Sequence, residues 1–204
     1  MSDTDIAARF ASDTAKHELT VLHDEGLYRH LRFKQPDRGA FFWFDLITWP
    51  GCLTIRGDFG EGYTFARLTD MFEFFRGKGG INAHYWSEKL DSGRSSAKEY
   101  SEALFRQLVT EHVVEAIRYG RAPRGIGRAV QKDILGSFDL CDEAVARQAL
   151  DEFEFKGFRF HDTWEWDFRD YRWQFLWACH AIVDGIRRYD AAKAAPVAVA
   201  GGAA

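Results

Sequence analysis

The chain has 204 residues, of which 46% are hydrophobic and 16% aromatic, a composition typical of folded globular proteins and not of disordered ones. Its formal net charge of −4 argues against broad, non-specific affinity for nucleic acid, which requires a positive electrostatic field. The three cysteines, Cys52, Cys141 and Cys179, are widely spaced, so they predict reduced thiols rather than a disulfide framework or a zinc ribbon.

The sequence also carries expectations about location and domain number. The opening residues MSDTD contain acids where a signal peptide has a basic region, and no stretch of about 18 apolar residues could span a bilayer. We therefore expect a soluble, cytoplasmic protein without a membrane partner. Residues 1–190 are expected to form a single domain, and the Ala-rich residues 191–204 to form a disordered tail.

The first half of the chain is predicted to be β-structure after a short helix over 6–18. Apolar residues that alternate or run continuously predict strands, in chain order, over 27–34, 41–47, 53–56 and 63–68, with 19–22 as a candidate fifth strand. The stretch 41–47 is apolar on both faces, which favours a central strand. Because short connections force neighbouring strands to be antiparallel, we expect a meander of four to five strands.

From residue 69 onward the pattern is helical. Asp70 and Asn82 stand where a side chain can cap a short helix, and Ser96 with Glu99 has the spacing of a capping box. The long helix that should follow has a stripe of apolar residues at helical spacing: Phe105, Val109, Val113 and Ala116. Shorter helices are predicted over 126–134 and 143–155.

The segment from Trp164 to Tyr189 carries aromatic and aliphatic residues at steps of three and four, which predicts a helix surrounded by protein. Asp162 and Glu165 have the spacing of a capping box at its start. The predicted fold class is α+β: an N-terminal antiparallel β-meander of four to five strands, packed against a C-terminal set of helices with this aromatic helix at the centre.

Charge is concentrated in two blocks of opposite sign. Residues 118–132 contain five basic residues and no acid, whereas residues 139–170 contain ten acids and four bases. Solvated faces explain both blocks, and interaction surfaces are the alternative. A nucleic-acid-binding surface would use Arg118, Arg121, Arg124, Arg128 and Lys132. A protein-binding surface with aromatic anchors would use Trp164, Glu165, Trp166, Asp167 and Asp170.

Two neighbouring His and Asp pairs have the composition of a catalytic or metal site. His180 and Asp184 lie four residues apart on the predicted aromatic helix, so the carboxylate can orient the imidazole. His161 precedes Asp162 at the predicted start of that helix. The structural interpretations are favoured, because a carboxylate satisfies a half-buried imidazole and acids are common in the first turn of a helix.

Asp45 and Asp58 are two further carboxylates, and they come from different predicted strands. Asp58 lies in a Gly-rich loop, where an Asp side chain commonly stabilises a turn. No set of residues converges on one reaction, so we assign no catalytic residue, no metal ligand and no cofactor. A metal-dependent hydrolase or nuclease that uses Asp45, Asp58, His161 or His180 is the remaining enzymatic alternative.

Several segments carry a pattern that is specific as a set: 30–33 (HLRF), 44–51 (FDLITWPG), 57–58 (GD), 63–75 (YTFARLTDMFEFF), 81–90 (INAHYWSEKL) and 164–167 (WEWD). Together they resemble a family of small, uncharacterised accessory proteins of tailed bacteriophages and prophages, over most of residues 17–190. The resemblance brings no catalytic residues. It implies a non-enzymatic protein that binds a host or phage protein complex, including inhibitors of host defence such as anti-CRISPR proteins.

Overall fold

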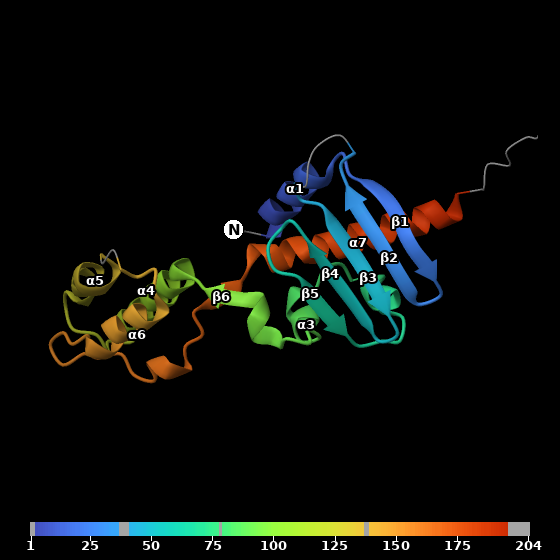
Figure 1. The fold of residues 1–204 in the computed structure, drawn as a ribbon. Coiled ribbons are helices and arrows are strands. Elements are labelled where there is room, and N and C mark those ends of the chain that lie inside the picture. Colours follow the sequence, from blue (N-terminus) through green and yellow to red (C-terminus); the bar gives the residue numbers. More distant parts are fainter. Residues whose placement is uncertain (1–2, 37–40, 78, 137–138, 196–204) are drawn as a thin grey trace, which may run out of the picture. The chain divides into compact units, whose positions relative to one another are not determined.

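The structure, a computed structural model, describes residues 3–36, 41–77, 79–136 and 139–195 (Figure 1). The chain forms two compact units. Unit 1 consists of Met1–Ala97 and Tyr171–Ala204, and unit 2 consists of the intervening Lys98–Asp170. Unit 2 is therefore an insertion in the sequence of unit 1.

A five-stranded antiparallel sheet is the centre of unit 1. Its strands follow one another in space as they do along the chain: β1 (Glu18–Glu25), β2 (Tyr28–Lys34), β3 (Phe44–Trp49), β4 (Cys52–Gly57) and β5 (Tyr63–Ala66). The predicted meander is confirmed with the fifth strand included, and β3 is the central strand as expected. Gly51 has a φ of +87°, which explains the Pro-Gly turn between β3 and β4.

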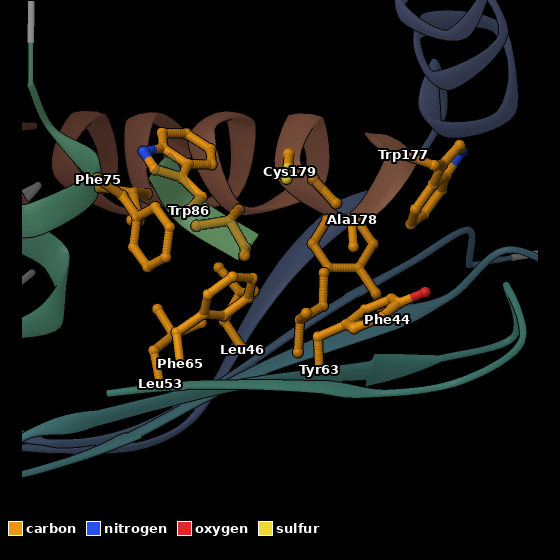
Figure 2. Packing of buried hydrophobic residues seen from close by; sticks show 14 of the residues in the cluster. Phe44, Leu46, Leu53, Tyr63, Phe65, Phe75, Trp86, Trp177, Ala178 and Cys179 are labelled. Atoms are coloured by element: carbon orange, nitrogen blue, oxygen red, sulfur yellow. The ribbon is translucent and has the colours of Figure 1, made fainter. Parts of the chain in front are cut away.

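The helices of unit 1 cover one face of this sheet. They are α1 (Asp3–Thr14), α2 (Met71–Phe75), α3 (Ala83–Ser87) and α7 (Trp173–Ala194), with a short 3₁₀ turn, η1 (Arg94–Ala97), at the end of the first segment. Figure 2 shows Phe44 and Tyr63 of the sheet pointing toward α7, from which Trp177 and Ala178 point back. A Cβ added at Gly185 would lie 2.6 Å from Leu46 Cδ1, so glycine at this position lets α7 approach the sheet without displacing the Leu46 side chain.

Two of the predicted helix caps are confirmed. The Asp70 carboxylate accepts a hydrogen bond from the Phe72 amide at 2.9 Å, and Asn82 Oδ1 accepts one from the Tyr85 amide at 3.0 Å. Asp70 also binds both terminal nitrogens of Arg29, at 2.9 and 3.0 Å. The same carboxylate therefore begins α2 and ties it to β2.

The aromatic helix, α7, begins at Trp173, nine residues after its predicted start at Trp164. Trp164 lies in a separate 3₁₀ turn, η3 (Thr163–Glu165), and Asp162 has a φ of +55° without a side-chain capping bond. The chain then continues as β7 (Arg169–Tyr171), which pairs with β6 (Lys98–Tyr100). Pairing with a distant strand therefore overrides the local helical spacing over residues 164–171, and the predicted capping box at Asp162 and Glu165 is wrong.

Unit 2 contains the remaining helices and its own hydrophobic cluster. Its elements are β6, α4 (Glu102–Arg118), α5 (Ile126–Val130), the π-helical turn η2 (Gln131–Leu135), α6 (Glu143–Glu152), η3 and the first two residues of β7, whose last residue, Tyr171, is assigned to unit 1. The predicted apolar stripe of α4 is buried, as the sequence indicated. Its cap is Ser101, whose hydroxyl accepts from the Leu104 amide at 3.2 Å, and not Ser96, because residues 98–100 form β6.

The α+β class is confirmed: the antiparallel sheet lies in the N-terminal half and most of the helices lie in the C-terminal half. Each unit buries a separate cluster of apolar side chains. The single domain over residues 1–190 stays a prediction, because compactness does not measure independent folding. Of the expected tail over 191–204, residues through Ala194 belong to α7, and residues 196–204 lie outside the described residues.

None of the helices in the described part of the chain is long and apolar enough to cross a membrane.

Candidate functional site

The acidic aromatic residues predicted to bind a partner lie on unit 2, around η3 and β7. Trp164 is 76% exposed, and Glu165, Asp167 and Asp170 are also exposed, whereas Trp166 is half-buried. We call these five residues the acidic aromatic surface. An exposed fraction of this size is uncommon for tryptophan, which is highly buried on average, and tryptophan is enriched among the hot spots of protein interfaces.

The backbone under this surface is held by α6. Arg147 donates to the carbonyl oxygens of Thr163 at 3.2 Å and Trp166 at 3.1 Å, and its guanidinium lies 4.8 Å from the centre of the Phe168 ring. Glu143, one turn earlier on α6, accepts from this guanidinium at 2.9 Å. The segment that presents the acidic aromatic surface is therefore fixed although it has little regular secondary structure.

Asp167 is held as a carboxylate. Burial opposes its ionisation, but the Arg169 amide at 3.0 Å and the Lys98 ammonium at 3.2 Å outweigh that effect and hold the pKa of Asp167 below its ordinary value. Next to it, the Trp166 ring packs 4.9 Å from the imidazole of His112, centre to centre, and 6.0 Å from the Phe168 ring.

A cavity of about 400 Å³ lies between α4 and the segment 166–167. Its lining consists of Leu108, Glu111, His112 and Glu115 from α4 together with Trp166 and Asp167. We call it the acidic pocket, because three of these side chains are carboxylates and its walls are otherwise apolar or aromatic. A pocket of this composition favours a cationic or aromatic group of a ligand.

A second cavity, of about 420 Å³, shares His112 and Glu115 with the acidic pocket. We call it the mixed pocket, since imidazole, guanidinium and carboxylate groups all contribute to its lining: His112, Glu115, Ala116, Arg121, Gly157, Phe158, Arg159, His161 and Asp162. Burial lowers the pKa of His112, so its imidazole is neutral at pH 7.

The predicted nucleic-acid-binding residues Arg118, Arg121, Arg124, Arg128 and Lys132 lie between the end of α4 and η2, and most of their side chains are exposed. We call them the basic segment. Lys132 lies 3.7 Å from the carboxylate of Asp133, and the Lys156 ammonium donates to the Arg124 carbonyl at 3.3 Å, which adds a sixth cation to this end of unit 2. Arg121 is the member of this set that lines the mixed pocket.

Asp45 and Asp58, the two carboxylates considered as catalytic, do not lie together, and each has a structural role. Asp45 is 1% exposed and accepts from Arg32 at 2.8 and 2.9 Å. The Asp58 carboxylate accepts from the Phe42 amide at 3.1 Å and thereby shapes the approach to β3.

His180 and Asp184 form the predicted pair on the aromatic helix. Asp184 binds Arg188 at 2.6 Å, and the His180 ring stacks on the Phe10 ring with 6.1 Å between the ring centres. Of the four candidates for an enzyme site, His161 is the one that lines the mixed pocket. Within residues 3–36, 41–77, 79–136 and 139–195, no three His, Cys, Asp or Glu side chains are placed to hold a metal ion together.

Sequence reasoning missed the residues that α4 supplies to the two pockets, namely Glu111, His112 and Glu115. It considered only the buried stripe of this helix. The positions of Leu108, Glu111, His112 and Glu115 follow helical spacing on a face beside that stripe, which was the available signal. Nothing local, however, indicates that Trp166 and Asp167 lie opposite them.

Comparison of the chain with protein-family models, with curated proteins and with solved structures finds no match.

Proposed function

We propose that this chain is a non-enzymatic binding protein that captures a protein partner through the acidic aromatic surface of unit 2. One observation carries the proposal: Trp166 and Asp167 of that surface line a pocket of about 400 Å³ together with Glu111 and Glu115 of α4. The acidic block of the sequence is thus extended by carboxylates from a helix some fifty residues earlier. A solvated face does not require such a concave arrangement.

The chemistry of the surface specifies the kind of partner. An exposed indole at Trp164 can enter an apolar pocket of the partner, and the surrounding carboxylates attract a basic face and speed the encounter. Basic faces are characteristic of proteins that bind nucleic acid. Combined with the resemblance of the sequence to phage and prophage accessory proteins, this chemistry leads us to propose a cytoplasmic phage or prophage accessory protein that occupies such a face, for example in a host defence complex.

Trp164 gives the sharpest test because its side chain is 76% exposed. We expect Trp164→Ala to leave the fold intact and to weaken partner binding by about 30-fold, the effect typical of an interface hot spot. The partner is first captured with the tagged full chain from infected cells, then purified, and its affinity is measured by calorimetry. Tyr28→Ala removes a 56% exposed ring from unit 1 and is the matched control.

A charge reversal separates the aromatic contribution from the electrostatic one. Glu165→Lys is preferable to a change at Asp167, whose carboxylate accepts from the Arg169 amide and pairs with Lys98. Glu165→Lys should slow association with the partner and reduce the effect of salt on the association rate. Binding that is unchanged in both Trp164→Ala and Glu165→Lys contradicts the proposal.

Nucleic-acid binding through the basic segment is the second candidate, because five basic side chains and Lys156 lie at one end of unit 2. Mobility shifts across a salt series test it. Changing Arg118 and Arg124 to Gln should lower the slope of log affinity against log salt by about 0.7–0.9 for each phosphate that is no longer neutralised, whereas Arg67→Gln on unit 1 should not change it. Absence of binding at about 50 mM salt removes this candidate.

A metal-dependent hydrolase or nuclease gains no support from the described residues, since its carboxylates and imidazoles do not gather into a ligand set.

A further inference from the structure

The mixed pocket shares His112 and Glu115 with the acidic pocket, but none of the five residues of the acidic aromatic surface lines it. Its lining contains the guanidinium groups of Arg121 and Arg159 and the imidazoles of His112 and His161. They come from α4 and the residues directly after it, and from the segment 157–162, so two stretches of chain that are distant in sequence converge on one cavity. Convergence of this kind on a cavity of about 420 Å³ is typical of small-ligand sites.

The segment 157–162 reaches the cavity through a two-residue hairpin turn. Phe155 and Phe158 exchange backbone hydrogen bonds at 3.0 Å in both directions, and the two residues between them, Lys156 and Gly157, have φ values of +51° and +79°. Two successive positive φ values are the geometry of a type I′ turn. The turn places Phe158 and Arg159 in the wall of the mixed pocket.

The guanidinium groups in the lining are held only weakly within the protein. Arg121 lies 3.4 Å from Glu115, and both side chains are more than half exposed, at 65% and 60%. Arg159 pairs with Glu154, again between exposed side chains. Exposed ion pairs contribute little to stability, so each guanidinium can leave its carboxylate for a doubly charged anion at small cost.

We propose that the mixed pocket binds a phosphate monoester, with Arg121 and Arg159 contacting the phosphoryl oxygens. Guanidinium groups match the geometry of phosphate, and the imidazoles of His112 and His161 add hydrogen-bond donors beside them. Lys156, directly before the lining residue Gly157, adds a further positive charge to this turn and favours a dianion.

The remaining lining residues suit the organic part of such a ligand. The Phe158 and His112 rings offer apolar contact, and the carboxylates of Glu115 and Asp162 can accept hydrogen bonds from hydroxyl or amino groups. These two carboxylates repel inorganic phosphate. They favour a phosphate ester whose organic part carries hydrogen-bond donors, because those donors can bind the carboxylates. A nucleotide satisfies both requirements, whether it is free or forms the 5′ end of a strand.

Calorimetric titration of the full chain with AMP, at low ionic strength, tests the proposal. Adenosine and inorganic phosphate separate the two halves of the ligand, and a 5′-phosphorylated hexanucleotide distinguishes a strand end from a free nucleotide. We expect AMP to bind more tightly than either half. Arg121→Gln and Arg159→Gln should each weaken AMP binding by about tenfold, the effect of removing one charge-assisted hydrogen bond.

Arg169→Gln is the matched control, because it removes one exposed positive charge from unit 2 outside both the pocket and the basic segment. It should change AMP affinity by less than about twofold. Circular dichroism of every variant establishes that the exposed changes leave the fold intact. No binding of AMP, phosphate or the phosphorylated strand at about 10 mM overturns the proposal, and so does an equal weakening in Arg169→Gln, which would indicate diffuse attraction.

Discussion

At the scale of single residues, Asp45 shows how a carboxylate can be buried on the outer face of a sheet. It lies on β3 opposite Arg32 and Arg56, on the side away from the helices, yet it is only 1% exposed. Arg32 binds both of its oxygens, and His30 Nε2 lies 3.1 Å from Oδ2. The three basic side chains therefore form a cover over the carboxylate, and its role is structural.

Removing this charge should destabilise unit 1. We expect Asp45→Asn to lower the free energy of unfolding at pH 7 by about 2 kcal/mol, because Arg32 loses a bidentate partner but remains partly solvated. Urea unfolding followed by tryptophan fluorescence measures the difference. Asp91→Asn removes an exposed carboxylate from the same unit and should have little effect.

The effect should also depend on pH. Burial opposes ionisation of Asp45, but the hydrogen bonds from Arg32 and the nearby His30 imidazole outweigh burial and hold its pKa below the ordinary value. Between the folded and the unfolded pKa the unfolded chain binds more protons, so this stabilisation is present above the unfolded pKa and is lost as pH falls. The difference in the free energy of unfolding between wild type and Asp45→Asn should therefore narrow toward about pH 2. If this difference stays constant with pH, packing and not charge explains the destabilisation.

At the scale of elements, α4 separates what the sequence could predict from what it could not. Its buried side was readable because Phe105, Val109 and Val113 repeat at helical spacing, and the structure buries all three. Its exposed side carries Glu111 and Glu115, whose importance depends on Trp166 and Asp167 lying opposite them. That proximity arises from tertiary packing, and no local pattern encodes it.

The residues before α7 show that a clear local pattern can also predict the wrong structure. Residues 164–171 have the spacing of a helix, but Phe168 packs at 5.0 Å against Phe105 in the cluster of unit 2, and residues 169–171 pair with β6. Helical spacing over a few residues is a weak preference that such long-range contacts readily override. Asp70 and Asn82 were predictable by contrast, since a helix cap depends only on the adjacent turn.

At the scale of the whole molecule, the insertion of unit 2 leaves the two hydrophobic clusters without shared members. The buried residues of the unit 1 cluster come only from residues up to Ala97 and from Phe175 onward. The Arg172 amide donates to the Ala97 carbonyl at 2.9 Å, so the two ends that unit 2 interrupts lie side by side within unit 1. Joining them requires little loop-closure entropy.

This arrangement predicts that unit 1 folds without the insertion. A chain in which about four Gly and Ser residues replace 98–170 should unfold cooperatively and keep the near-ultraviolet circular dichroism of Trp177, because the Phe44 and Phe59 rings that pack on that indole remain. The same chain carrying Trp177→Ala is the control that assigns the signal, and this variant should be less stable by about 3–5 kcal/mol. If the shortened chain instead unfolds without cooperativity, unit 1 depends on unit 2 for stability. The chain then behaves as the single domain over residues 1–190 that its composition predicts.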